Sequence, residues 1–120
     1  MIDPAYEALA NANALTEVRV VHDYLQFIFE PYTLSVYAPV EIHEGHRALK
    51  LRDIGYYDAI CFLIGQTLTA VVRERSRRLQ FTFSGGIDLF VSMRGEDATC
   101  PEAAILSRAG EVIMVEGYEE

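Results

Sequence analysis

Two histidines three residues apart, each next to a glutamate, are the residues of this 120-residue chain that most resemble a metal site. They lie in the segment Glu41-Ile42-His43-Glu44-Gly45-His46. Imidazole nitrogens and carboxylate oxygens are the ligands that zinc and related ions take. On a strand, however, His43 and His46 point to opposite faces, and Gly45 disfavours a helix that would bring them together. We therefore interpret the segment as a polar connecting loop. A metal-dependent enzyme built on Glu41, His43, Glu44 and His46 stays as an alternative.

A second candidate for chemistry is the dipeptide His22-Asp23, in which a carboxylate could orient an imidazole as a general base. It falls between two apolar segments, where the pattern predicts a hairpin turn, and no serine or cysteine nucleophile is indicated nearby. We predict a surface turn, and we assign no catalytic residue and no cofactor.

Arginines crowd one stretch of the chain, at Arg73, Arg75, Arg77 and Arg78. Arginine clusters hold phosphate or carboxylate groups through paired hydrogen bonds, so they are candidate partner-binding residues. The alternative, which the acidic composition favours, is that they bind the chain's own carboxylates or protect a hairpin from edge pairing. Tyr32 and Tyr37 are further candidates for partner binding, because tyrosine is enriched at interfaces; packing at the edge of a core explains them equally well.

The elements that position these residues follow from an internal repeat. Leu79-Gln80-Phe81-Thr82-Phe83 resembles Leu25-Gln26-Phe27-Ile28-Phe29, and the similarity extends over residues 15–38 and 68–93. The shared apolar residues lie at strand spacing, so each copy predicts a three-stranded antiparallel meander.

Helical patterns precede both meanders, at residues 5–12 and 56–64, and Gly65 is a typical left-handed C-terminal cap. The alternation of Leu49 and Leu51 with charged residues predicts a short strand in the connection. Pro101-Glu102 predicts the start of a helix to about Arg108, and residues 111–116 a last strand.

We therefore predict an α+β fold in which an αβββ unit is duplicated and followed by an extra helix and strand. The 120 residues form one domain. Its parts are a first repeat over about 3–38, a connector over 39–53, a second repeat over about 54–93 and a C-terminal segment over 94–120. Periodicity leaves open whether the strands form one sheet or two facing sheets.

The charge balance restricts the partners. Ten basic and 18 acidic residues give a net charge of −8, which argues against a general affinity for nucleic acid and suits a basic protein partner. No apolar run reaches the length of a membrane span, and the N-terminal residues do not resemble a signal peptide. We expect a cytoplasmic protein.

The stretches 58–71 (Asp-Ala-Ile-Cys-Phe-Leu-Ile-Gly-Gln-Thr-Leu-Thr-Ala-Val) and 79–86 (Leu-Gln-Phe-Thr-Phe-Ser-Gly-Gly) resemble a group of small bacterial proteins. Some members of that group look like immunity proteins of polymorphic toxin systems. The similarity covers about residues 53–106, including Pro101-Glu102-Ala103-Ala104, and its motifs belong to the fold: a buried helix, a cap glycine, a central strand and a hairpin turn. It carries over no catalytic residue.

Three functional expectations follow. The first is a non-enzymatic bacterial protein-binding module, such as an immunity protein that occludes a basic, toxin-like partner. The second is a homodimeric assembly module that pairs through a sheet edge or the face bearing Ile28. The third is the metal-dependent enzyme.

Overall fold

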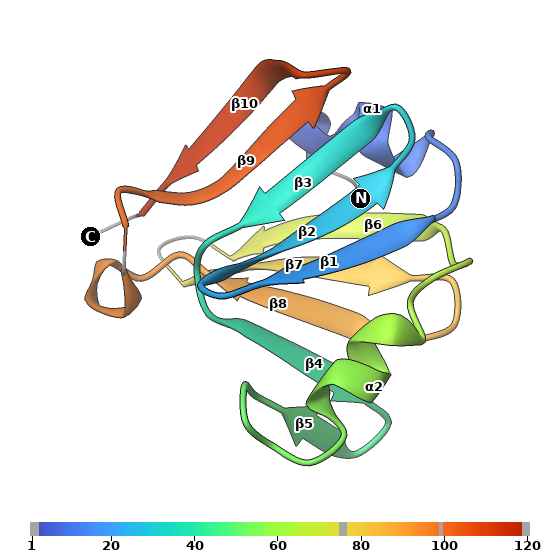
Figure 1. Cartoon of the computed structure of the whole chain (residues 1–120), viewed down its shortest axis with the longest axis vertical. Coiled ribbons are helices and arrows are strands. Elements are labelled where there is room, and N and C mark those ends of the chain that lie inside the picture. Colours follow the sequence, from blue (N-terminus) through green and yellow to red (C-terminus); the bar gives the residue numbers. More distant parts are fainter. Residues whose placement is uncertain (1–2, 75–76, 99, 119–120) are drawn as a thin grey trace.

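The structure of the chain is a computed structural model that describes residues 3–74, 77–98 and 100–118. It is mostly β, with two five-stranded antiparallel sheets that face each other (Figure 1). The first sheet, in spatial order, contains β1 (Glu17–Val21), β2 (Tyr24–Phe29), β3 (Tyr32–Val36), β9 (Glu102–Arg108) and β10 (Glu111–Gly117). The second contains β5 (Arg47–Leu49), β4 (Val40–Glu44), β8 (Asp88–Ser92), β7 (Arg78–Phe83) and β6 (Leu68–Glu74).

Helical structure is limited to short segments. The 3-10 turn η1 (Pro4–Tyr6) leads into α1 (Glu7–Ala10), and α2 (Tyr56–Cys61) precedes β6. A further 3-10 turn, η2 (Gly95–Asp97), lies between β8 and β9. No helix in the described part of the chain is long and apolar enough to cross a membrane.

The predicted α+β class with a C-terminal helix is wrong. Residues 102–108, expected as a helix, form β9, which pairs with β3 on one side and β10 on the other. Alanine at 103 and 104 favours a helix in isolation. In the chain these residues are almost fully buried and complete the hydrogen bonding of β3, so pairing within the sheet overrides the intrinsic preference.

Both predicted meanders are present, as β1–β2–β3 and β6–β7–β8. The interpretation of residues 41–46 as a polar loop is wrong, because Val40–Glu44 form β4, which pairs with β8 and β5. The predicted short strand of the connector is present as β5. Val40 and Ile42 point into the core while Glu41 and His43 lie on the outer face, so the alternation typical of a strand was present in the sequence.

Each meander is followed by a hairpin that joins the opposite sheet. β4–β5 follows the first meander but extends the sheet of the second, and β9–β10 follows the second meander but extends the sheet of the first. The two sheets therefore have the same strand order and complete each other. Matching positions are Leu25 and Leu79, Val36 and Val91, Ala104 and Val40, Leu106 and Ile42, and Met114 and Leu49.

One hydrophobic core fills the space between the sheets. The matching residues Phe29 and Phe83 stack on each other across it, with ring centroids 6.3 Å apart, and Tyr6 packs edge-on against Phe81 at 5.3 Å. The 56–64 segment is less buried than its apolar composition predicts. Phe62 is 68% exposed, and Cys61 is also exposed, although its place within an apolar run predicts a core residue. A short helix over the end of a sandwich has one covered face only.

Candidate binding recess

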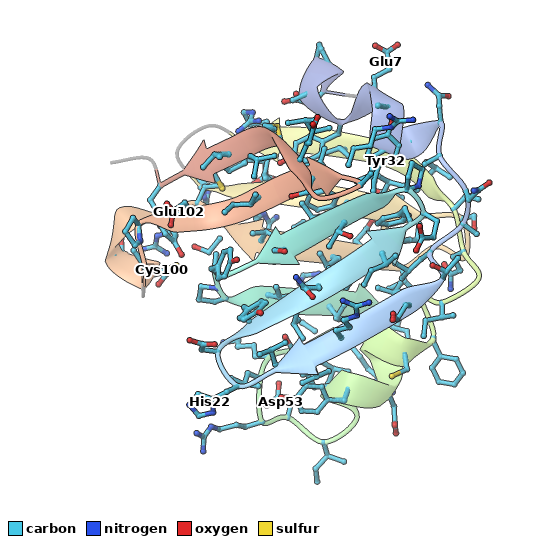
Figure 2. The ribbon with its side chains drawn as sticks, turned by 45° about the horizontal axis from the view of Figure 1, so that its top comes forward. Glu7, His22, Tyr32, Asp53, Cys100 and Glu102 are labelled. Atoms are coloured by element: carbon cyan, nitrogen blue, oxygen red, sulfur yellow. The ribbon has the colours of Figure 1, made fainter. Side chains whose placement is uncertain are left out.

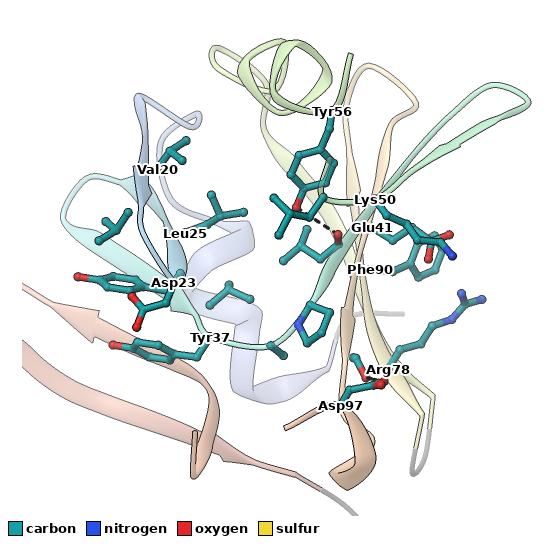
Figure 3. Close-up of a pocket in the computed structure, with 18 of the residues that line it drawn as sticks. Val20, Asp23, Leu25, Tyr37, Glu41, Lys50, Tyr56, Arg78, Phe90 and Asp97 are labelled. Atoms are coloured by element: carbon teal, nitrogen blue, oxygen red, sulfur yellow. Dashed lines mark hydrogen bonds between the residues drawn. The ribbon is translucent and has the colours of Figure 1, made fainter. Parts of the chain in front are cut away.

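A recess of about 700 Å³ opens where the two sheets separate, between the tip of the β1–β2 hairpin, the start of β4 and α2. We call it the recess. Figure 3 shows Val20 and Leu25 on one wall, facing Tyr56 on the other. Side chains projecting from both sheets form its walls, and they fall into three groups. The inner wall has Val20, Leu25, Val36, Val40, Leu51 and Tyr56; the outer part has Glu41, Lys50, Arg78, Phe90, Ser92 and Asp97; the rim includes His22, Asp23, Tyr24, Tyr37, Arg77 and Arg94.

The inner wall is apolar and half open. Val36 and Tyr56 are nearly fully buried at its base, whereas Val20 and Leu51 are 54% and 57% exposed at its mouth. The hydroxyl of Tyr56 donates a hydrogen bond of 3.1 Å to the carbonyl of Val40, which fixes the ring against the start of β4 (Figure 3). Burial raises the pKa of Tyr56 to about 12, with a smaller contribution from the neighbouring Tyr57. The inner wall thus presents apolar surface without an ionised group.

The outer part lies on the outer face of the second sheet, where Figure 3 shows Glu41, Phe90 and Arg78. Phe90 is covered there by the guanidinium of Arg78, 3.9 Å from the ring centroid, and by the edge of His43. Arg78 is also held by Glu74, with 2.9 Å between Nε and Oε2. Such cation–π stacking fixes a guanidinium at the surface.

The charge of the recess departs from that of the chain. Among the described lining residues, four are lysine or arginine and three are carboxylates, against ten and 18 in the whole sequence. Asp97 accepts a hydrogen bond from Ser92 at 2.6 Å, and Glu41 lies 2.7 Å from His43. Lys50 and Arg77 have no acidic partner among the described residues. Arg78 and Arg94 pair with Glu74 and Glu96, so Lys50 and Arg77 are the cations of the recess that have no acidic partner in the described part of the chain. Asp23 and Asp97 likewise have no basic partner among these residues.

A charged cluster fills a different part of the molecule, between η1, β6 and β10. Arg73 donates two hydrogen bonds to Glu116, of 3.0 and 2.7 Å, and a third to Asp3 of 2.9 Å. The hydroxyl of Tyr6 donates to the same glutamate at 2.6 Å. Burial and this hydrogen bond raise the pKa of Tyr6, and the hydrogen bond to Glu116 raises the pKa of Arg73. We call this region the closed end.

The candidate metal site does not assemble. His43 lies on the outer face of β4 against Glu41 and Phe90, while His46 lies in the β4–β5 turn. Glu44 pairs with Arg47 at 3.3 Å instead. Across the described part of the chain, no group of three or more His, Cys, Asp or Glu side chains is placed to hold a metal ion.

The arginine cluster is divided by the structure. Arg73 belongs to the closed end, as the alternative of binding the chain's own carboxylates predicted, and Arg78 is engaged by Glu74 and Phe90. Arg77 is exposed at the rim of the recess. Arg75 lies outside the described residues.

The remaining candidates lie at the surface. Tyr37 lines the recess with its ring 5.0 Å from that of Tyr24. Tyr32 is elsewhere, at the start of β3, where Arg108 lies 5.9 Å above its ring. His22 and Asp23 form the β1–β2 turn, as predicted, and Figure 2 shows His22 projecting at the tip of that hairpin, far from Glu7 of α1.

Sequence reasoning therefore found parts of the rim and missed the inner wall. Val20, Leu51 and Tyr56 are separated by up to 36 positions and carry no motif, and only the exchange of hairpins between the sheets brings them together. Comparison with known proteins gave no match to a family model, a curated protein or a solved structure.

Proposed function

We propose that this chain is a non-enzymatic protein-binding module of the bacterial cytoplasm that uses the recess to hold its partner. The observation that carries the proposal is the recess itself: an open cavity of about 700 Å³ with an apolar inner wall and a charged outer part, where Lys50 and Arg77 have no acidic partner among the described residues. Concave sites that combine apolar walls with a small number of polar groups are typical binding sites. In the outer part of the recess, Glu41 lies 2.7 Å from His43 and Asp97 accepts a hydrogen bond from Ser92.

An immunity protein that occludes a toxin is one form of this function, and it is motivated by the resemblance of residues 53–106. The net charge of −8 would accelerate the approach of a basic partner, while the recess supplies the local contacts. Growth protection tests this form. The chain is expressed with the products of neighbouring genes, and the immunity function is rejected if none of them is toxic alone and neutralised by the chain.

Site-specific photo-cross-linking in cells tests binding through the recess. A photoreactive amino acid at Val21, which is 37% exposed at the rim, should give an adduct with a protein partner. The same group at Val72, which is 42% exposed on β6 and does not line the recess, is the control. The purified partner should then bind the wild-type chain. Its affinity for a variant with Val20→Arg and Leu51→Glu should be at least ten-fold lower. Equal adducts at both positions, or equal affinity for both proteins, would reject the recess as the binding site.

The β10 edge supports a second candidate, the homodimeric assembly module. Among the described strands, β10 is the last of the first sheet and pairs only with β9. Its side chains Val112, Ile113 and Val115 are 58%, 49% and 53% exposed. Such an apolar edge favours strand pairing with another chain. Light scattering tests this candidate by measuring the molecular mass in solution. A wild-type dimer should become a monomer in the Val112→Lys variant. A wild-type protein that is monomeric at high concentration would exclude this function.

A further inference from the structure

The recess and the closed end occupy equivalent places in the two halves of the fold. Val20 pairs with Leu25 in the β1–β2 ladder, and Arg73 pairs with Leu79 in the β6–β7 ladder. Leu25 and Leu79 are matching residues of the two central strands, so Val20 is the counterpart of Arg73. One half has a guanidinium at this position and the other has an exposed isopropyl group.

A second pair of matching positions, after that of Val20 and Arg73, lies in the exchanged hairpins. Glu116 lies two residues after Met114 in β10, and Leu51 lies two residues after the matching Leu49 of β5. Glu116 is 7% exposed because Arg73 and Tyr6 cover it, whereas Leu51 is 57% exposed. Leucine thus replaces the carboxylate that would complete an ion pair.

The third position is a tyrosine in both halves. Tyr6 and Tyr56 are both buried in the helical segment that precedes a meander, and each donates its hydroxyl hydrogen to the hairpin exchanged from the other half. Tyr6 bonds Glu116 of β10 and Tyr56 bonds the carbonyl of Val40 in β4. Both ends therefore have a buried tyrosine, but the Arg73–Glu116 ion pair of the closed end has no counterpart at the recess.

We propose that the recess takes an extended peptide segment of the partner, with a large apolar side chain between Val20, Leu51 and Tyr56 and flanking carboxylates on Lys50 and Arg77. This inference rests on the proposed function and specifies its ligand. The apolar group occupies the volume that the Arg73–Glu116 pair fills at the closed end. The carboxylates neutralise the two cations that have no acidic partner in the described structure.

The unpaired cations of the recess and the net charge of the chain predict opposite preferences. A net charge of −8 favours a basic peptide, whereas Lys50 and Arg77, which have no acidic partner among the described residues, favour carboxylates placed next to them. Short-range pairing at a site outweighs the field of distant charges that salt screens beyond about 8–10 Å. A peptide that contacts the recess should therefore be selected by the local charges.

Fluorescence anisotropy with two labelled heptapeptides tests this on the full chain. One peptide has a central phenylalanine flanked by two aspartates on each side and ends in glycine at both termini, and the other has lysine in place of every aspartate. We expect the acidic peptide to bind at least ten-fold more tightly. Reversing both cations, with Lys50→Glu and Arg77→Glu, should reverse this order. Arg19→Glu with Arg108→Glu makes the same change of charge at exposed positions outside the recess and should preserve it.

The second test introduces the ion pair of the closed end at the matching positions of the recess. Val20→Arg with Leu51→Glu copies the Arg73–Glu116 pair into the open end at two exposed positions, and the variant should keep the circular dichroism and melting temperature of the wild type. Binding of the acidic peptide should fall at least ten-fold. If the lysine peptide binds the wild type more tightly and this variant loses that binding, the inference of an acidic ligand is overturned, although the recess remains the binding site. The inference is also overturned if neither peptide binds at millimolar concentration, or if this variant still binds the acidic peptide as the wild type does. The cross-linking at Val21 decides separately whether a partner uses the recess.

Discussion

Tyr56 is the residue whose ionisation most directly links the recess to folding. Its pKa is raised from 10.0 to about 12 by burial, so the folded state holds the phenolic proton at a pH where the unfolded chain has released it. The stability it contributes is complete below about pH 10 and falls as the pH rises from about 10 to 12, by up to about 3 kcal/mol, since each pKa unit is worth about 1.4 kcal/mol. Tyr6, whose pKa is also raised, acts in the same direction.

Urea unfolding at pH 8 and pH 11.5 measures this loss. Tyr56→Phe should cost about 1 kcal/mol at pH 8, because the hydrogen bond to Val40 disappears, and it should reduce the alkaline loss relative to the wild type. Tyr57→Phe, at an exposed neighbouring position, is the control. An alkaline loss of the same size in Tyr56→Phe and wild type would contradict the assignment.

The closed end gives the second prediction for single residues. Glu116 is buried, and its charge is compensated by Arg73. Arg73→Met leaves that carboxylate without its cation and should destabilise the fold by about 3 kcal/mol in chemical denaturation. Adding Glu116→Leu removes the stranded charge and should recover much of the loss. If the double variant is as unstable as Arg73→Met alone, the ion pair is not the reason for the effect.

Among the elements, the exchanged hairpins contribute matching buried residues to the core. Ile42 of β4 and Leu106 of β9 occupy matching positions in the two sheets, and both are fully buried. Ile42→Ala and Leu106→Ala should each cost about 2–5 kcal/mol and should agree within about 1 kcal/mol, because their surroundings are equivalent. The free energy of unfolding measures both. A loss below about 1 kcal/mol at either position would show that its hairpin is peripheral.

The central strands were predictable and the exchanged hairpins were not, for a physical reason. Phe27 and Phe81 lie in meanders whose partners are neighbours in sequence, so local alternation determines the pairing. Ala104 pairs with Val36 of β3, 68 residues earlier in the chain, and no local signal specifies that partner. A helix preference was then the only information available for that segment, and the prediction followed it.

The same distinction applies to the candidate site. Arg77 and Tyr37 belong to types that are enriched at binding sites, and they could be selected from the sequence. Val20 and Leu51 could not, because an exposed aliphatic residue has no chemical signature and becomes informative only beside Tyr56. The comparison of the repeats aligns Val20 with Arg73 and marks a position where the two copies differ in character, but it does not reveal that Leu51 and Tyr56 lie beside Val20.

For the whole molecule, the exchange of hairpins predicts a single cooperative unfolding transition. Each sheet contains strands from both halves of the chain, so neither half can form a complete sheet alone. Unfolding curves in urea followed by tyrosine fluorescence and by far-ultraviolet circular dichroism should coincide. Separate transitions would show that the halves unfold independently. Folding should also be slow for a chain of this size, in the range of milliseconds to seconds, because the β3–β9 and β4–β8 pairings close long loops.

Exchanged hairpins have one more consequence, for symmetry. Two separate polypeptides that traded such hairpins would form a pair with two identical ends, and any substitution would alter both ends at once. A single polypeptide encodes each end with its own residues. One end can therefore hold η1, β6 and β10 together through Asp3, Arg73 and Glu116, while the residues of the other end can change without altering this ion pair.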